Sequence, residues 1–157
     1  MRKSTMEIRD TNKLVELLTT CEVGRLGTIG GDGYPMVKPL NFAYVHGKIY
    51  FHTARDGEKI EDIARNSRVC FEIDVPLGYR KAAGHPCEAG FRYRSVIMKG
   101  RAIMVEDGGE RLLALDALMA KYQPEGGYGS YLPDKLGITG IVRIDIEEMT
   151  GKEQLHG

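Results

Sequence analysis

A candidate anion site follows a predicted strand in the first half of the chain. The stretch 51–60, FHTARDGEKI, runs from an apolar strand through a short polar loop into a predicted helix. Lys59 lies in the first turn of that helix, where a cation is unfavourable because the helix N-terminus is already partially positive. A bound phosphate would relieve this, with free N–H groups, the Lys59 ammonium and the Thr53 hydroxyl as donors. The plainer alternative is a solvated Lys59 beside the acidic Glu58.

A second candidate is the segment 37–43, VKPLNFA, in which a proline interrupts a predicted strand. Because Pro39 has no N–H to give to a sheet ladder, the segment belongs at a sheet edge or a bulge. Pro39 and Asn41 share one face, and Lys38 points to the other. An irregular edge of this kind offers backbone groups to a planar ligand. The alternative is an ordinary edge strand that Pro39 and Lys38 protect against aggregation.

The third candidate is the strand-like stretch 91–97, FRYRSVI. Arg92 and Arg94 alternate with Tyr93 and Ser95, so the two arginines share a face. They either pair with carboxylates across the sheet or face an anionic ligand. In the second case Tyr93 or Ser95 would hydrogen-bond a heterocycle.

Metal and disulfide chemistry receive little support from the sequence. His85 and Cys87 are two potential ligands, which do not make a closed metal site, and a flexible loop is the alternative. The three cysteines, at 21, 70 and 87, are odd in number and widely spaced, which is typical of reduced thiols in a cytoplasm. The sequence also lacks a Ser-His-Asp order, a phosphate-loop signature and a dinucleotide fingerprint.

Length and charge narrow the classes of protein further. A chain of 157 residues indicates a single domain, 1–157. Its 22 basic and 22 acidic residues balance, which argues against nucleic-acid binding through bulk charge and permits self-association. The N-terminus has no apolar run of a secretion signal, and no stretch reaches membrane-spanning length. We therefore expect a cytoplasmic protein without nucleic-acid or membrane partners.

The elements that position these candidates follow from periodicity and turn residues. Helices are predicted at 10–21, 58–65 with Asp56 as the cap, and 107–122. Strands are predicted at 22–29, 34–45, 48–53, 68–75, 91–106 with Gly100 as a possible bulge, and 140–148, with loops at 76–90 and 123–139. Hairpin-linked strands with about three helices predict an α+β fold built on an antiparallel β-barrel. The 20 glycines fall mainly in its turns and corners.

Several short motifs together resemble one protein family. They are Val23–Gly27, Pro39–Phe42, Tyr50–Thr53 with Gly57 and Lys59, Arg68–Glu72, Tyr93–Val96 and Thr150–Glu153. Their order over residues 5–153 resembles that of the nitroimidazole-resistance (Nim-type) proteins, within the pyridoxamine 5′-phosphate oxidase-like, FMN-binding split-barrel superfamily.

The resemblance implies a six-stranded split β-barrel that binds FMN at a homodimer interface. It implies that His52, Thr53 and Lys59 hold the flavin phosphate and that the backbone of Lys38, Pro39, Leu40 and Asn41 lies along the isoalloxazine ring. It also implies that Tyr93, Arg94 and Ser95 complete the cofactor site. His52 is the catalytic candidate that the resemblance supplies, beside the flavin.

The sequence departs from pyridoxamine phosphate oxidases proper in two ways. Glu58-Lys59 stands where those enzymes carry two adjacent basic residues, and the chain has no tryptophan for their C-terminal substrate site. Vitamin B6 oxidation is therefore not expected. The leading hypothesis is an FMN-dependent oxidoreductase acting on small planar nitro or quinone-like compounds. One alternative is haem binding or breakdown, with His52, His85, His156 or a cysteine as axial ligand, and another is a flavin-storing or sensing module without turnover.

Overall fold

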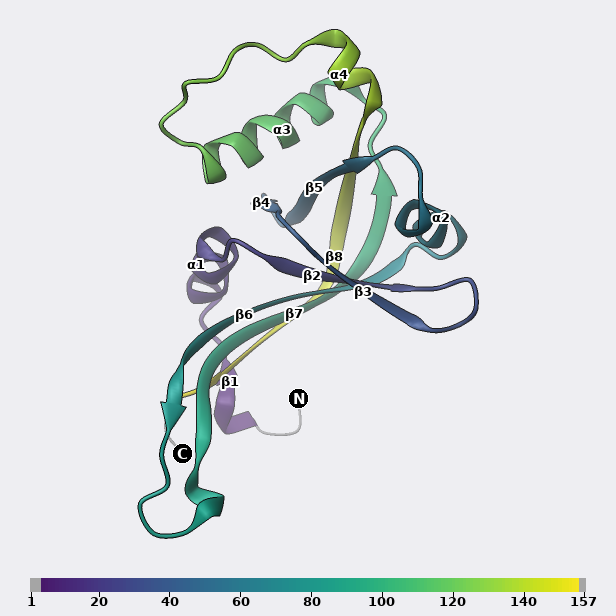
Figure 1. Ribbon diagram of the computed structural model, residues 1–157. Helices are drawn as coiled ribbons and strands as arrows, with labels where there is room; N and C mark the ends of the chain where they lie inside the picture. The colour runs from purple at the N-terminus through teal and green to yellow at the C-terminus, as the bar shows by residue number, and fades with distance from the viewer. Residues whose placement is uncertain (1–3, 156–157) are drawn as a thin grey trace.

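Antiparallel strands form one strongly curved sheet around the core in this computed structural model, which describes residues 4–155 (Figure 1). The sheet order is β3-β2-β6-β7-β8-β5-β4, and β1 pairs with β8. The strands are β1 (Glu7–Ile8), β2 (Gly24–Ile29), β3 (Pro35–Leu40), β4 (Ala43–Val45), β5 (Lys48–Ala54), β6 (Arg68–Arg80), β7 (Gly90–Met104) and β8 (Thr139–Gln154). The helices are α1 (Thr11–Thr20), α2 (Glu58–Arg65), α3 (Gly108–Tyr122) and α4 (Pro133–Ile138), with short 3-10 turns η1 (Ser4–Met6) and η2 (Pro86–Glu88).

The predicted α+β class with an antiparallel barrel is confirmed, although the sheet within the described range has eight strands rather than six. The short β1 and the helix α4 were not expected. Within residues 4–155 no helix is long and apolar enough to cross a membrane.

Local sequence signals account for most helix ends. The carboxylate of Asp10 accepts a hydrogen bond from the Asn12 N–H at the start of α1, and Asp107 accepts one from the Glu110 N–H at 2.8 Å at the start of α3. The predicted cap of α2 is wrong by one residue. Gly57, and not Asp56, occupies the cap with φ of 105°, a left-handed value that glycine adopts without a steric penalty.

The predicted strand 34–45 is present but interrupted, because the chain leaves the sheet between β3 and β4. Phe42 is fully buried at this break and packs edge-on against Phe71, with ring centroids 5.0 Å apart. Its N–H donates to the Tyr122 hydroxyl at 2.9 Å instead of to a neighbouring strand, and that hydroxyl donates to the Glu22 carbonyl at 2.6 Å. A core aromatic and a hydrogen bond from α3 therefore replace sheet pairing here.

The predicted loops 76–90 and 123–139 are too long, and the last strand is longer than the predicted 140–148. β6 continues to Arg80 because a register shift between Pro76 and Gly78 absorbs the proline within the β6–β7 ladder. Together the paired ends of β6 and β7 form a hairpin that projects from the barrel (Figure 1); we call residues 76–94 the arm.

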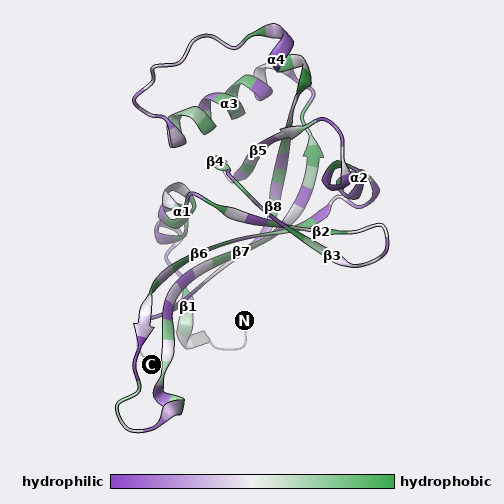
Figure 2. Ribbon diagram, viewed as in Figure 1, coloured by the Kyte–Doolittle hydropathy of each residue, from purple (hydrophilic) through white to green (hydrophobic). Residues whose placement is uncertain are grey.

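Alternation along β7 divides its side chains between the core and an outer face. The hydropathy of successive residues also varies along this ribbon (Figure 2). Val96, Met98 and Ala102 are buried in the core, whereas Ile97 and Ile103 between them are exposed. The predicted bulge at Gly100 is confirmed by a register shift between Lys99 and Gly100 opposite β8. We call the side of β2, β3, β6 and β7 that carries Ile97 the outer face.

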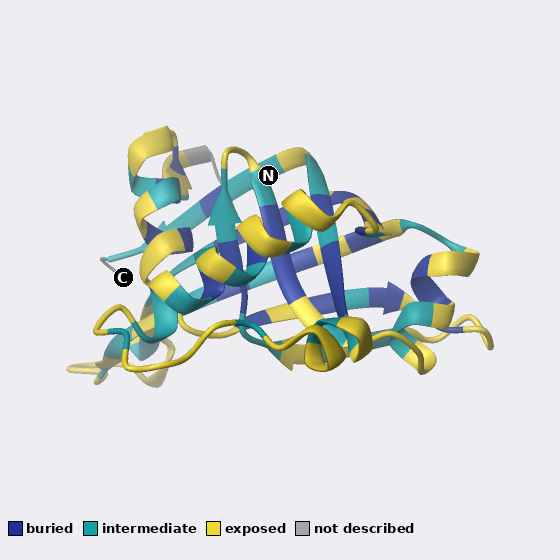
Figure 3. Ribbon diagram, turned by 90° about the horizontal axis from the view of Figure 1, so that it is seen from above, coloured by how far each residue is buried: buried dark blue, intermediate teal, exposed yellow. Residues whose placement is uncertain are grey.

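The segment 106–138, which we call the lobe, contains α3 and α4 and packs outside β4 and β5. Tyr50, Val105, Ala114 and Ile141 form a small buried cluster beneath α3. Seen from above, the opposite side of α3 and most of the 123–132 connection are exposed (Figure 3). The lobe therefore adds a second, smaller core to the barrel.

Lys121, near the end of α3, is a half-buried lysine held without a carboxylate contact in the described part of the chain. Its ammonium donates to the Leu18 carbonyl at 3.1 Å and lies 3.7 Å from the centroid of the Phe42 ring. Leu18 is in the last turn of α1, where carbonyls lack helical partners and attract a cation. Burial lowers the pKa of Lys121 to about 8.

We expect Gly100→Ala to destabilise the protein by about 2–3 kcal/mol, because an overpacked core forces backbone shifts. An added Cβ would lie 2.2 Å from the Asp145 carbonyl oxygen, a backbone atom of the paired strand. Gly137→Ala is the matched control, since its Cβ would meet nothing within 4 Å. Urea unfolding measures both; equal midpoints for the two variants would contradict this account of the bulge.

The Lys121 ammonium makes the free energy of unfolding depend on pH. Its folded pKa of about 8 lies below the unfolded value, so the unfolded chain binds more protons between these values. Stability contributed at this site therefore increases as the pH rises from about 8 toward 10. Comparing wild type with Lys121→Met by thermal unfolding across this range isolates the contribution. The difference between the two proteins should change with pH above 8; a constant difference would show that Lys121 does not titrate there.

Candidate functional site

The N-terminus of α2 carries the predicted anion site. β5 ends at Ala54, a three-residue loop follows, and α2 begins at Glu58 with no side chain capping its first turn. Lys59 is half-buried, with its Nζ atom 5.3 Å from the centroid of the Phe51 ring. Burial lowers the pKa of Lys59, the Lys38 ammonium lowers it further, and no carboxylate is among the groups that shift it. The site therefore holds positive charge that an anion would stabilise.

Lys38 reaches the same end of α2 from β3. Its ammonium forms an ion pair with Glu58 and also lies near the Lys59 ammonium. The Glu58 carboxylate thus balances one of these two positive charges. Thr53 lies on the face of β5 that also carries Phe51, beneath Lys59. His52 is exposed and points to the opposite face of β5. The structure thus brings together Lys38, Thr53 and Lys59, and places His52 on the other side of the strand.

A buried carboxylate, which the sequence analysis missed, holds α2 in position. Asp62 is 1% exposed and accepts hydrogen bonds from the Thr28 hydroxyl at 2.9 Å and from the Arg65 guanidinium at 3.1 Å. The hydrogen bond from Thr28, with a further one from Arg65, lowers the pKa of Asp62. In the sequence, Asp62 stands among other charged residues of a helix, a pattern typical of a solvent-exposed helix face. Its buried contact with Thr28 becomes evident only from the packing of α2 on β2.

The predicted edge is confirmed, since β3 is the terminal strand of the sheet order. Pro39 is exposed there, while Leu40 and Asn41 are half-buried. Because β2 is the one partner of β3 among the described strands, one side of its backbone has no sheet pairing within residues 4–155. Lys38 lies on this edge strand and contacts Glu58 at the start of α2, so the edge adjoins the α2 site.

Tyr93, Arg94 and Ser95 do not meet the α2 site within one chain. They lie on β7 opposite residues 74–76 of β6 and 152–154 of β8. Arg94 pairs with Glu153 at 3.2 Å, and Lys13 pairs with the same carboxylate at 2.7 Å. Ala102, which lies beneath α2, is seven residues farther along β7, or about 24 Å at the rise of a strand.

His85 and Cys87 lie at the tip of the arm, and both are exposed. The Glu88 carboxylate folds this tip by accepting hydrogen bonds from the N–H groups of Ala83 and Gly84. Among the residues from 4 to 155, no three His, Cys, Asp or Glu side chains gather as metal ligands would.

Two apolar hollows lie on the sheet, one beside α2 and one on the outer face. The first, about 310 Å³, lies between α2 and the neighbouring strands and is lined by Ile60, Ile63, Ala64, Ser67, Ala102, Ile103, Met104 and Val142. The second, about 500 Å³, opens on the outer face and includes Gly27, Ile29, Pro35, Val37, Arg68, Cys70 and Lys99. Both are open at the surface, so a ligand or a second protein chain can reach them.

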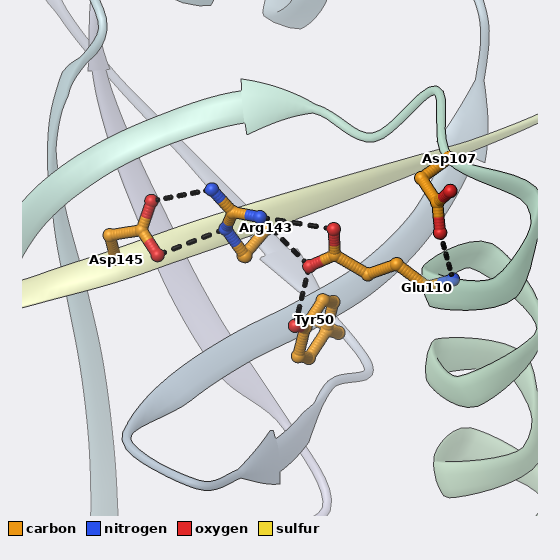
Figure 4. Close-up of polar contacts among 5 residues, drawn as sticks. All are labelled: Tyr50, Asp107, Glu110, Arg143 and Asp145. Atoms are coloured by element: carbon orange, nitrogen blue, oxygen red, sulfur yellow. Dashed lines mark hydrogen bonds and ion pairs between the residues drawn. The ribbon is translucent and has the colours of Figure 1, made fainter.

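A polar network, also missed from the sequence, fastens the lobe to the barrel (Figure 4). Arg143 of β8 donates to the Glu110 carboxylate of α3 at 2.8 and 3.0 Å and pairs with Asp145 at 2.9 Å. The Tyr50 hydroxyl donates to Glu110 at 2.8 Å. Burial and this hydrogen bond raise the pKa of Tyr50 to about 12. Every charged group of the network is partnered, which indicates a structural role.

Comparison with solved structures places this geometry among known proteins. A candidate 5-nitroimidazole antibiotic resistance protein from Bacteroides thetaiotaomicron is 28% identical, with a TM-score of 0.81 over 94% of this chain and 86% of that one. An FAD-binding protein from Mesorhizobium loti is 26% identical, with a TM-score of 0.64 over 92% and 95%. The flavocytochrome Anf3 from Azotobacter vinelandii shares the fold, with a TM-score of 0.86 at 17% identity over 98% and 72%.

A search of curated proteins found no match. The family model described as pyridoxamine 5′-phosphate oxidase, in contrast, matches residues 10–153, which is nearly the whole chain. The family match and the fold agree with the resemblance seen in the sequence motifs. The chain belongs to the pyridoxamine 5′-phosphate oxidase family.

Proposed function

We propose that this protein binds FMN and uses it as an oxidoreductase on small planar nitro or quinone-like compounds. The observation that carries the proposal is the half-buried Lys59, which has no carboxylate among its electrostatic partners and lies at the uncapped N-terminus of α2. A dianionic phosphate would supply the missing countercharge. Family membership and the likeness to a candidate nitroimidazole-resistance protein and an FAD-binding protein support a flavin as the group that carries it.

The residues suit such a cofactor in type and position. Lys59, Lys38 and the Thr53 hydroxyl would hold the phosphate, together with N–H groups of the first turn of α2. The free edge of β3, from Lys38 to Asn41, would present its backbone to the flavin ring. The flavin supplies two-electron chemistry, and the chain supplies binding and orientation. His52 is the group that we propose to interact with the substrate, because its imidazole is exposed next to Thr53.

We further propose a homodimer that closes the cofactor site across the outer face. Exposed Ile29, Val37 and Ile97, with the hollow of about 500 Å³, give this face an apolar centre. Ion pairs of Arg25 with Glu72 and Asp74 border it. A second copy would bring its own Tyr93 and Ser95 toward the α2 end of β7, which one chain alone does not do. The three cysteines are free thiols, which supports a location in the reducing cytoplasm.

Haem binding has less support in the described part of the chain. An axial histidine would have to face an apolar cavity, yet His52 and His85 are exposed and neither apolar hollow contains a histidine. Cys70 lines the second hollow, but burial raises the pKa of its thiol, which disfavours the thiolate that would ligate iron. His156 lies outside the described residues. The absorbance spectrum of protein purified without added cofactor distinguishes FMN from haem. Flavin bands support the proposal, and a Soret band with no flavin bands would overturn it.

We expect Lys59→Met to weaken FMN binding by about tenfold to a hundredfold, the range for losing one charged hydrogen bond. Isothermal titration measures this, with Lys48→Met at the opposite end of β5 as the control that retains wild-type affinity. Because the Lys59 ammonium must be charged to bind phosphate, wild-type affinity should fall as the pH rises through its lowered pKa. Equal affinities of wild type and Lys59→Met would refute the phosphate site.

We expect His52→Ala to retain FMN but to reduce a nitroaromatic or quinone substrate at least tenfold more slowly with a nicotinamide as reductant, as loss of a proton-transfer group does. His46→Ala, in the turn before β5, is the control. Stopped-flow absorbance separates flavin reduction from substrate reduction. Bound FMN that no nicotinamide reduces would favour the storing or sensing module over the enzyme.

A further inference from the structure

Within residues 4–155, the arm is the part of the sheet that ends with two strands. The described pairing of β7 with β8 runs as far as Tyr93 and Gln154, and beyond it the described ladder is that of β7 with β6, as far as Arg80 and Gly90. Two-stranded ribbons are at best marginally stable in water without further packing. Yet Tyr79 and Phe91 form an aromatic pair at this tip, with centroids 6.3 Å apart, and are 60% and 52% exposed. The arm therefore offers an uncovered apolar contact.

The lobe offers a second uncovered apolar surface at the opposite end of the molecule (Figure 1). Its exposed apolar side chains are 41% to 66% accessible and come from α3, α4 and the connection between them: Leu112, Leu113, Tyr128, Leu132 and Ile138. Figure 3 shows this side of the lobe as largely exposed. Exposed apolar side chains that gather in one patch often mark a surface that contacts another protein.

The two surfaces carry opposite charge. Residues 76–94 of the arm contain four Lys or Arg and one Glu; Arg94 is paired with Glu153 of β8, and the other charged residues of the arm sum to +2. Residues 106–138 of the lobe contain six Asp or Glu and three Lys or Arg; Glu106 and Glu110 are paired with Arg55 and Arg143 outside the segment, and the other charged residues sum to −1. Exposed Lys81 and Arg92 on the arm, and exposed Glu125 and Asp134 on the lobe, give the two ends of a neutral chain unlike charge. Such a distribution favours contact between the unlike ends of two copies.

β7 sets the distance between these ends. It runs for 15 residues from the arm to the start of the lobe, about 48 Å at the rise of a strand. Its middle residue, Ile97, is 44% exposed on the outer face. A two-fold axis through Ile97 places Phe91 of one copy opposite Ile103 of the other, because each lies six residues from the axis. The same axis carries each arm to the lobe of the other copy.

We propose that the arm of each protomer docks on the lobe of a second copy of this chain. The inference rests on the homodimer of the proposed function and adds its orientation, antiparallel about the middle of β7, and the segments that hold it. Tyr79 and Phe91 pack on the apolar surface of the lobe, and the basic arm faces the acidic lobe. The ends of the dimer are thereby fastened outside the flavin site.

A charge exchange tests the contact in the full-length protein. Lys81→Glu with Arg92→Glu on the arm, and Glu125→Lys with Asp134→Lys on the lobe, should each raise the dimer dissociation constant by about fivefold to tenfold, as expected for two exposed ion pairs. Combining all four substitutions should restore it to near the wild-type value. Sedimentation velocity measures the constants, Glu16→Lys on α1 is the control, and thermal unfolding reports whether each variant folds.

The apolar part of the contact has its own test. Phe91→Ser should weaken the dimer at least tenfold, as loss of an aromatic anchor does, whereas Val23→Ser, an equally exposed apolar residue outside both surfaces, should not. Amide hydrogen exchange should slow in 79–91 and 124–138 together as protein concentration rises. Slowing in only one of these segments would contradict the docking.

The outcomes separate this inference from the flavin proposal. A dimer that retains FMN but ignores both charge reversals overturns arm docking and leaves the flavin proposal intact. Charge reversals that rescue each other in a protein without FMN support the docking and refute the flavin site. A chain that stays monomeric at all concentrations overturns the docking.

Discussion

Two-sided pairing of β7 is the constraint on which the rest of the structure depends. This strand hydrogen-bonds to β6 on one side and to β8 on the other, so its alternation assigns side chains to the core or to the outer face. The close approach of Gly100 to the Asp145 carbonyl produces the bulge that lets these long strands curve. One end of β7 continues into the arm and the other leads to the lobe, and α2 packs near its lobe end.

A few buried or partly buried polar groups join the helices to this sheet and to one another. Asp62 binds Thr28 of β2, Arg143 of β8 binds Glu110 of α3, and Lys121 binds the Leu18 carbonyl at the end of α1. A buried polar group without a partner is costly, so each of these contacts defines one position for its helix. The α2 end is different, because the described contacts of the Lys59 ammonium are with the Phe51 ring and the Lys38 ammonium, while the nearby Glu58 carboxylate pairs with Lys38. That contrast is the physical reason for assigning a ligand to α2 and structural roles elsewhere.

Sequence reasoning succeeded where a local signal acts alone. The bulge at Gly100 and the edge at Pro39 depend on neighbouring backbone, and the structure contains both of them. It failed where distant partners decide. The strand 34–45 breaks because Tyr122 binds the backbone of Phe42, and β6 continues past Pro76 because β7 pairs around it. Likewise, Lys59 was identified from its place in a helix, whereas Asp62 was not.

Periodicity, turn residues and motif order are properties of neighbouring residues, and they are enough to predict the fold class, the family and the type of residues at the α2 end. They do not predict that Lys38 approaches Lys59, that His52 faces away from it, or that Tyr93 and Ser95 lie far along β7. These outcomes depend on strand register and helix packing. Contacts between residues distant in the chain set both, and local pattern does not encode them.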